Sequence, residues 1–206
     1  TVSDNVLIIT CLVLPWLITL ILGAATGPHR DAQASTCVCF LSFGVTEFLT
    51  DIIKAYCGSF RPNFYDLCEF DGAATKTCTG EDAKEGYLSF PSGHASIAFC
   101  GMTFLTMYLL GKVGLERNPE LFSPMRRLWY VAATTLPMAY AFFVATSRVK
   151  DSYHHPADVV GGILIGFGSS LWAYRIWYPS VHDREGPGVP LATLFEWMPT
   201  RTSVVK

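Results

Sequence analysis

Five long, mostly apolar stretches divide the chain, and polar or charged residues gather between them. An α-helix needs ~20 such residues to cross the hydrocarbon core of a bilayer. A soluble helical protein would not be expected to carry five stretches of this length. The sequence therefore predicts an all-α, polytopic membrane bundle. The predicted spans are Val6–Ala25, Ser35–Ile53, Ser92–Leu110, Leu128–Thr146 and Val159–Trp177.

Composition supports a membrane protein. Half of the 206 residues are hydrophobic and only 16% are charged, whereas charged residues make up ~25% of an average soluble protein. The net charge of −2 and the lack of a basic run argue against a nucleic-acid partner. Membrane lipids are the expected surroundings, and the sequence leaves open whether the protein forms a homo-oligomer.

One membrane domain is expected over residues 1–178, followed by a cytosolic tail over residues 179–206. The tail is rich in proline, glycine and charged residues, as is typical of a poorly ordered chain end. Nine of the 15 lysines and arginines lie in loops on the side of the C-terminus, and six lie opposite. Because positive charge accumulates on the cytosolic side, we expect the C-terminus to be cytosolic.

The longest connection, Pro62–Phe90, then lies on the opposite, extracellular or lumenal side. It carries Cys68 and Cys78. An oxidising compartment permits a disulfide between them, so we expect this bond to form.

Three separated segments carry residues suited to phosphate chemistry. Together they contain three cations, two imidazoles and a carboxylate, all near the ends of predicted spans. Such a set predicts a pocket for an anion at a membrane surface, and the imidazoles indicate that the anion reacts. The segments are Lys54-x6-Arg61-Pro62, Pro91-Ser92-Gly93-His94 and Ser147-Arg148-x5-His154-x3-Asp158.

In the first segment, Glu47, Asp51 and Lys54 recur at helical spacing and therefore share one face. A self-satisfied ion cluster is one interpretation. We instead expect Asp51, with Glu47 as a second candidate, to orient Lys54 toward a ligand. Arg61 offers a planar fork suited to two phosphate oxygens, and Pro62 is expected to stop the helix.

In the second segment, Pro91 suits a first helical turn and Ser92 is a good N-cap. The exposed N–H groups of a helix start attract anions, and Gly93 lets a ligand approach the backbone. His94 would stand beside the bound anion. A simple N-cap and an interfacial histidine are the alternative interpretations of this short segment.

The third segment places His154 and Asp158 four residues apart, on one face if the segment is helical. The carboxylate can then hold one imidazole nitrogen and leave the other free as a nucleophile. His155 would point about 100° away, the rotation per residue of a helix, and could not share the pairing. Arg148, preceded by Ser147, supplies the third cation. Metal ligation by the two histidines and the aspartate is disfavoured, because three adjacent cations would repel a divalent ion.

The order and spacing of these segments resemble the type 2 phosphatidic acid phosphatase superfamily. The sequences Thr50–Lys54, Arg61–Phe64 and Ser147–Val149 are similar to its eukaryotic lipid phosphate phosphatase branch. That branch has six spans, so its first helix is expected to be missing from this chain. The chain departs from the branch at Ser59, where an extra arginine is usual, and at Pro156, where an aromatic residue is common.

The resemblance implies a metal-independent enzyme without a cofactor, in the plasma membrane or an endomembrane. His154 would attack phosphorus and form a phosphohistidine, Asp158 would orient it, and His94 would protonate the leaving alkoxide. The remaining polar residues of the motifs would bind the phosphate. These are Lys54, Arg61, Ser92, Gly93 and Arg148.

The expected substrates are lipid phosphomonoesters such as phosphatidate, lysophosphatidate, sphingosine 1-phosphate or diacylglycerol pyrophosphate. A polyprenyl pyrophosphate phosphatase and a non-catalytic lipid-phosphate-binding signalling relative are the alternatives. A non-catalytic relative should have lost the nucleophile or the acid, whereas this chain keeps both. Motifs confined to one side do not favour a transporter, and the predicted spans argue against a soluble vanadate-dependent haloperoxidase.

Overall fold

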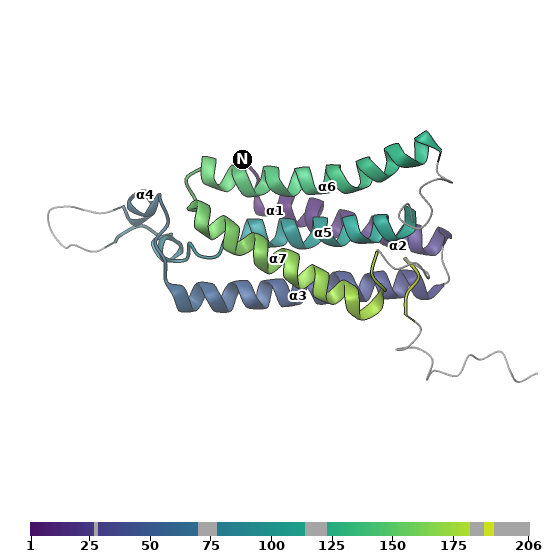
Figure 1. Ribbon diagram of the computed structural model, residues 1–206. Coiled ribbons are helices and arrows are strands. Elements are labelled where there is room, and N and C mark those ends of the chain that lie inside the picture. Colours follow the sequence, from purple (N-terminus) through teal and green to yellow (C-terminus); the bar gives the residue numbers. More distant parts are fainter. Residues whose placement is uncertain (27–28, 70–77, 114–122, 182–187, 192–206) are drawn as a thin grey trace, which may run out of the picture.

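The computed structural model describes residues 1–26, 29–69, 78–113, 123–181 and 188–191, and all regular secondary structure within them is helical. Figure 1 shows long helices running side by side. In chain order the elements are α1 (Asp4–Ile8), the π-helical turn η1 (Ile9–Val13), α2 (Leu14–Thr26), α3 (His29–Cys57), α4 (Phe64–Cys68), the 3-10 turn η2 (Glu85–Tyr87), α5 (Gly93–Val113), α6 (Pro124–Lys150) and α7 (Pro156–Trp177).

Five helical spans in the described residues are long and apolar enough to cross a membrane, which confirms the predicted all-α membrane bundle. The first span joins α1, η1 and α2. Its π-helical turn lies where Pro15 cannot supply the N–H that would bond the carbonyl of Cys11. The spans are Asp4–Ala25, Arg30–Cys57, Gly93–Val113, Pro124–Lys150 and Pro156–Trp177.

Helix α5 lies at the centre of the bundle and packs against the first span, α3, α6 and α7 (Figure 1). Glycines allow this close packing. A side chain at Gly101 of α5 would collide with the carbonyl of Cys11, and one at Gly162 or Gly166 of α7 would collide with the α5 backbone around Ser96. The start of α5 is therefore held firmly against α7.

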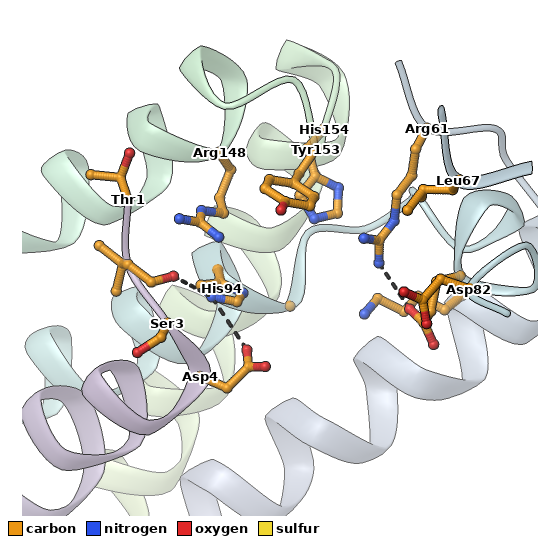
Figure 2. Close-up of a pocket in the computed structure, with 14 residues that line it drawn as sticks. Thr1, Ser3, Asp4, Arg61, Leu67, Asp82, His94, Arg148, Tyr153 and His154 are labelled. Carbon is orange, nitrogen blue, oxygen red and sulfur yellow. Dashed lines mark hydrogen bonds and ion pairs between the residues drawn. The ribbon is translucent and has the colours of Figure 1, made fainter. Parts of the chain in front are cut away.

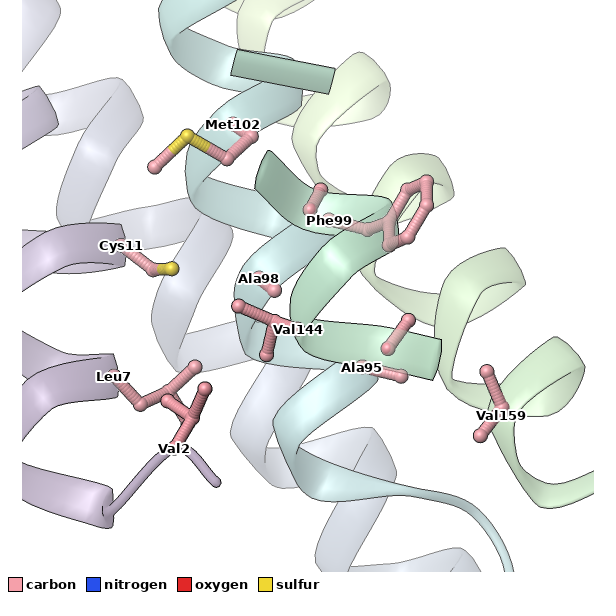
Figure 3. Close-up of a cluster of buried hydrophobic side chains, with 11 residues drawn as sticks. Val2, Leu7, Cys11, Ala95, Ala98, Phe99, Met102, Val144 and Val159 are labelled. Atoms are coloured by element: carbon pink, nitrogen blue, oxygen red, sulfur yellow. The ribbon is translucent and has the colours of Figure 1, made fainter. Parts of the chain in front are cut away.

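A cluster of buried apolar side chains joins the first span to α5, α6 and α7 (Figure 3). It includes Ala95 next to His94 and Val159 next to Asp158. His94 and Asp158 thus stand on tightly packed helix starts.

At the other end of the bundle, a buried polar cluster around Asp31 holds the helices together, and the Asp31 side chain is fully buried. Its carboxylate accepts hydrogen bonds from the Tyr108 hydroxyl at 2.9 Å, the Tyr178 hydroxyl at 2.8 Å and the Lys112 ammonium at 2.5 Å. Lys112 also donates to the carbonyl of Gly188 at 2.8 Å. The predicted tail thus returns to the bundle at residues 188–191, while most of it lies outside the described residues.

Candidate active site

A cavity of about 710 Å³ opens at the end of the bundle where α3 and α6 end and α5 begins. Figure 2 shows cationic and imidazole side chains from different elements pointing toward it. All three sequence-predicted segments contribute to its walls. From these segments, the lining residues are Lys54, Arg61, Gly93, His94, Arg148 and His154.

Lys54 lies in the last turn of α3, and its ammonium lies 3.2 Å from where a Cβ on Gly93 would be. One turn earlier, Thr50 donates to the Ser96 hydroxyl at 3.0 Å and so ties α3 to α5. The orienting role of Asp51, with Glu47 as a second candidate, stays a prediction. Both side chains are exposed, and Lys54 turns toward the start of α5 at Gly93.

Arg61 lies in the segment after α3 and faces the cavity. Its backbone N–H donates to the carbonyl of Gly86 at 2.8 Å, and its Nη2 donates to Glu85 Oε2 at 3.0 Å. The prediction that Pro62 stops the helix is wrong. Helix α3 already ends at Cys57, where Gly58 adopts a left-handed φ of 56° that glycine permits at little cost.

Helix α5 begins at Gly93, and Ser92 caps it by accepting a hydrogen bond from the backbone N–H of Ala95 at 3.4 Å. Pro91 lies just before the helix. His94 is in the first turn, with Nε2 3.4 Å from Asp4 Oδ1. Sequence reasoning missed Asp4, because it lies in the first span, far along the chain from the motifs.

Arg148 lies in the last turn of α6, and its side chain is almost fully buried. Its Nε donates to the Ser147 hydroxyl at 3.3 Å and its Nη2 to Asp151 at 3.2 Å. The guanidinium also lies over the ring of Tyr153, 5.6 Å from its centroid. These contacts hold the cation at the cavity wall, because each restricts its long side chain.

His154 lies in the turn between α6 and α7. Its backbone N–H donates to the carbonyl of Arg148, and Ser152 in the same turn has a left-handed φ of 60°. Helix α7 begins only at Pro156, so the prediction that His154 and Asp158 share a helix face is wrong. The two side chains still approach each other, with His154 Nδ1 3.7 Å from Asp158 Oδ2.

The prediction that His155 points away from Asp158 is also wrong. His155 is the N-cap of α7, and its Nδ1 lies 3.4 Å from the same carboxylate oxygen. The two imidazoles differ in burial, because the side chain of His154 is 5% exposed and that of His155 is 51% exposed. Of the two, His154 lines the cavity.

Asp158 is buried in the first turn of α7. Its Oδ2 accepts hydrogen bonds from the backbone N–H of His155 at 2.8 Å and from the Ser89 hydroxyl at 2.5 Å. Ser89 was not predicted as a site residue. A single serine outside the motifs carries no pattern that distinguishes it from other loop serines.

Burial, together with the nearby cations of Arg61 and Lys54, lowers the pKa of His154 to about 4, although Asp158 partly opposes this shift. An imidazole with this pKa is neutral at pH 7 and keeps a lone pair for attack on an electrophile. The cavity therefore combines fixed positive charge for an anion with a neutral, nucleophilic histidine.

Cys68 and Cys78 are joined by a disulfide bond next to this end of the bundle. The backbone N–H groups of Thr79 and Gly80 donate to the carbonyl of Cys68. Leu67 and Asp82, which flank the cross-linked segment, line the cavity. The disulfide thus anchors part of its wall.

Comparisons with known proteins agree with this geometry. A family model described as the PAP2 superfamily matches residues 35–181. Lipid phosphate phosphatase 1 from Arabidopsis thaliana is 38% identical over 152 residues, which cover 70% of this chain and 45% of that protein. Diacylglycerol pyrophosphate phosphatase 1 from Saccharomyces cerevisiae is 30% identical over 197 residues, which cover 88% of this chain and 66% of that protein.

The chain thus spans roughly half to two thirds of the length of these curated relatives. A solved structure, a transmembrane PAP2-type phosphatidylglycerolphosphate phosphatase from Bacillus subtilis, shares the fold. It has a TM-score of 0.52 and 21% identity, and covers 84% of this chain and 70% of its own. The extent of the family match, together with the motifs that meet at the cavity, shows that the chain belongs to the PAP2 superfamily.

Proposed function

We propose that this protein is a membrane lipid phosphate phosphatase. The observation that carries the proposal is the meeting of Lys54, Arg61 and Arg148 around a buried, neutral His154 at one end of a membrane bundle. Relatives named lipid phosphate phosphatase and diacylglycerol pyrophosphate phosphatase support the same substrate class. Phosphatidate, lysophosphatidate, sphingosine 1-phosphate and diacylglycerol pyrophosphate are the proposed substrates.

In the first step, the Nε2 lone pair of His154 attacks phosphorus, because the other ring nitrogen faces Asp158. The bond between phosphorus and the ester oxygen breaks, and the leaving alkoxide takes a proton from His94. The three cations stabilise the equatorial oxygens as charge develops on them. Asp158 stabilises the imidazolium that forms on His154.

In the second step, water attacks the phosphohistidine. Neutral His94 takes a proton from the water, the bond between phosphorus and His154 breaks, and inorganic phosphate leaves. The distribution of lysines and arginines among the loops supports a cavity that opens on the extracellular or lumenal side. The proposed location of the protein is the plasma membrane or an endomembrane. We assign this activity to residues 1–178.

Phosphate release from purified protein in detergent micelles tests the proposal, with a lipid phosphate panel compared with and without a chelator. His154→Ala should abolish turnover and the acid-labile phosphoenzyme. His155→Ala is the matched control. The exposed imidazole of His155 also approaches Asp158 but does not line the cavity, so this variant should keep most of the activity. A dead His155→Ala beside an active His154→Ala would overturn the assignment, and a wild type inactive on every lipid would overturn the function.

A further inference from the structure

Ser89 makes the shortest hydrogen bond to the Asp158 carboxylate. Its hydroxyl donates to Oδ2 at 2.5 Å, and both side chains are buried. Ser89 belongs to none of the three motif segments. We propose that Ser89 is a positioning residue, which holds the Asp158 carboxylate in the orientation that His154 needs for phosphoryl transfer. The inference rests on the proposed phosphatase function.

Ser89 is itself fixed in place by the backbone. Its N–H donates to the carbonyl of Ser59 at 2.9 Å, in the segment that leads to Arg61. Three residues later, the N–H of Ser92 donates to the backbone carbonyl of Asp158 at 2.9 Å. The segment before α5 therefore holds Asp158 at two points, its side chain through Ser89 and its main chain through Ser92.

The contacts of the Asp158 carboxylate explain why orientation matters. Oδ2 receives the Ser89 hydroxyl and the His155 N–H, and it is also the oxygen nearest His154 Nδ1, at 3.7 Å. His154 Nδ1 is buried, and the backbone of Ser89 also interacts with the His154 ring. Hydrogen bonds to a carboxylate are stronger than neutral ones, so two such donors restrict its rotation and keep Oδ2 beside the imidazole.

Ser89 acts through Asp158 and not on the substrate. Its side chain is fully buried, and it is not among the residues that line the cavity. Its removal should therefore slow the chemical step without weakening the binding of a phosphate group. This separation distinguishes a positioning role from a general disturbance of the cavity.

The test compares Ser89→Ala and Ser89→Cys with wild type in micelles of dioctanoyl phosphatidate. Both variants should lower kcat about 10- to 100-fold, the loss expected when a charge-assisted hydrogen bond that orients a reacting group is removed. KM should stay within about twofold, because ground-state binding is unchanged. The control is Ser170→Ala on α7, whose buried hydroxyl has no partner in the described part of the chain and whose loss should leave kcat unchanged.

Binding of two anions, measured by calorimetry, gives a readout independent of turnover. Inorganic phosphate binds in the cavity without forming a bond to His154. Orthovanadate can form such a bond and so resembles the transition state, which an enzyme binds more tightly than its substrate. Ser89→Ala should weaken vanadate binding by the same factor as kcat and leave phosphate binding unchanged. A general disturbance would weaken both.

The outcomes separate the two proposals. The positioning role is overturned if both variants match Ser170→Ala, if the Kd values of vanadate and phosphate change alike, or if neither variant folds. A wild type that releases no phosphate from any lipid phosphate overturns the function. In that case the Kd values of vanadate and phosphate still decide whether Ser89 holds the Asp158 carboxylate in place.

Discussion

We predict that Glu85 competes with the proposed substrate for Arg61, so that neutralising Glu85 should tighten substrate binding. The Arg61 guanidinium, which is mostly buried, donates to the Glu85 carboxylate at 3.0 Å. A phosphate that uses the same guanidinium must displace this carboxylate. Glu85→Gln keeps the length of the side chain and removes its charge, so it weakens the competitor without leaving a cavity.

The size of the effect follows from exposure. The Glu85 side chain is 57% exposed, and ion pairs that solvent reaches contribute ~0.2–1 kcal/mol. Since 1.36 kcal/mol corresponds to a factor of ten, removing the competing charge should lower KM by at most about fivefold. The value of kcat should change little, because the gain applies to ground state and transition state alike.

The assay is steady-state hydrolysis of dioctanoyl phosphatidate at low and high ionic strength. Salt screens exposed charges, so the KM difference should shrink as salt is added. Glu81→Gln is the matched control, because it removes the same charge from an exposed position that does not line the cavity. An unchanged or higher KM for Glu85→Gln, or the same decrease in both variants, would refute the competition.

Three further predictions concern stability, each followed by thermal unfolding in detergent. The pKa of His154 is lowered from 6.5 to about 4, chiefly by burial. Between these pH values the unfolded state binds a proton that the folded state does not bind. The free energy of unfolding should therefore decrease by up to about 3 kcal/mol as the pH is lowered from 6.5 to 4. The Tm of wild type should therefore fall more steeply than that of His154→Gln, and parallel curves would contradict this. The Cys68–Cys78 disulfide closes a short loop, so replacing both cysteines with serine should cost about 2–3 kcal/mol by loop entropy. An unchanged Tm would argue against that contribution. Asp31→Ala leaves the ammonium of Lys112 without its carboxylate and should lower the free energy of unfolding by about 3–5 kcal/mol. A Tm within error of wild type would show that the polar cluster around Asp31 does not hold the helices together.

The fold could be predicted because the length of an apolar stretch reports directly on the bilayer. Each predicted span overlaps one helical span of the structure to within a residue at its ends, and most of the helices extend further at their polar ends. Helix α3, for example, begins before Asp31 and continues past Lys54. Hydrophobicity does not detect these ends, because there the helix is stabilised by polar contacts at the bundle ends.

The residue types of the site were predictable, but their local geometry was not. Spacing places Asp51 and Lys54 on one helix face, yet it does not determine which way a flexible lysine turns. Pro156 was the available indication that α7 begins after His154, because proline favours the first helical position. Ser89 depends on a contact between residues 69 positions apart, which local sequence patterns do not encode.

The paired hydrogen bonds between the segments at Ser59–Arg61 and Gly86–Ser89 have a consequence for how this protein can diversify. They join the two ends of the intervening connection, at 2.9 Å and 2.8 Å, beside Arg61, which we propose binds phosphate. Loops anchored at their bases tolerate change at their tips. We therefore expect substitutions, insertions or the exchange of the connection between relatives to alter which ligands reach the cavity, while the side chains of the candidate site keep their positions.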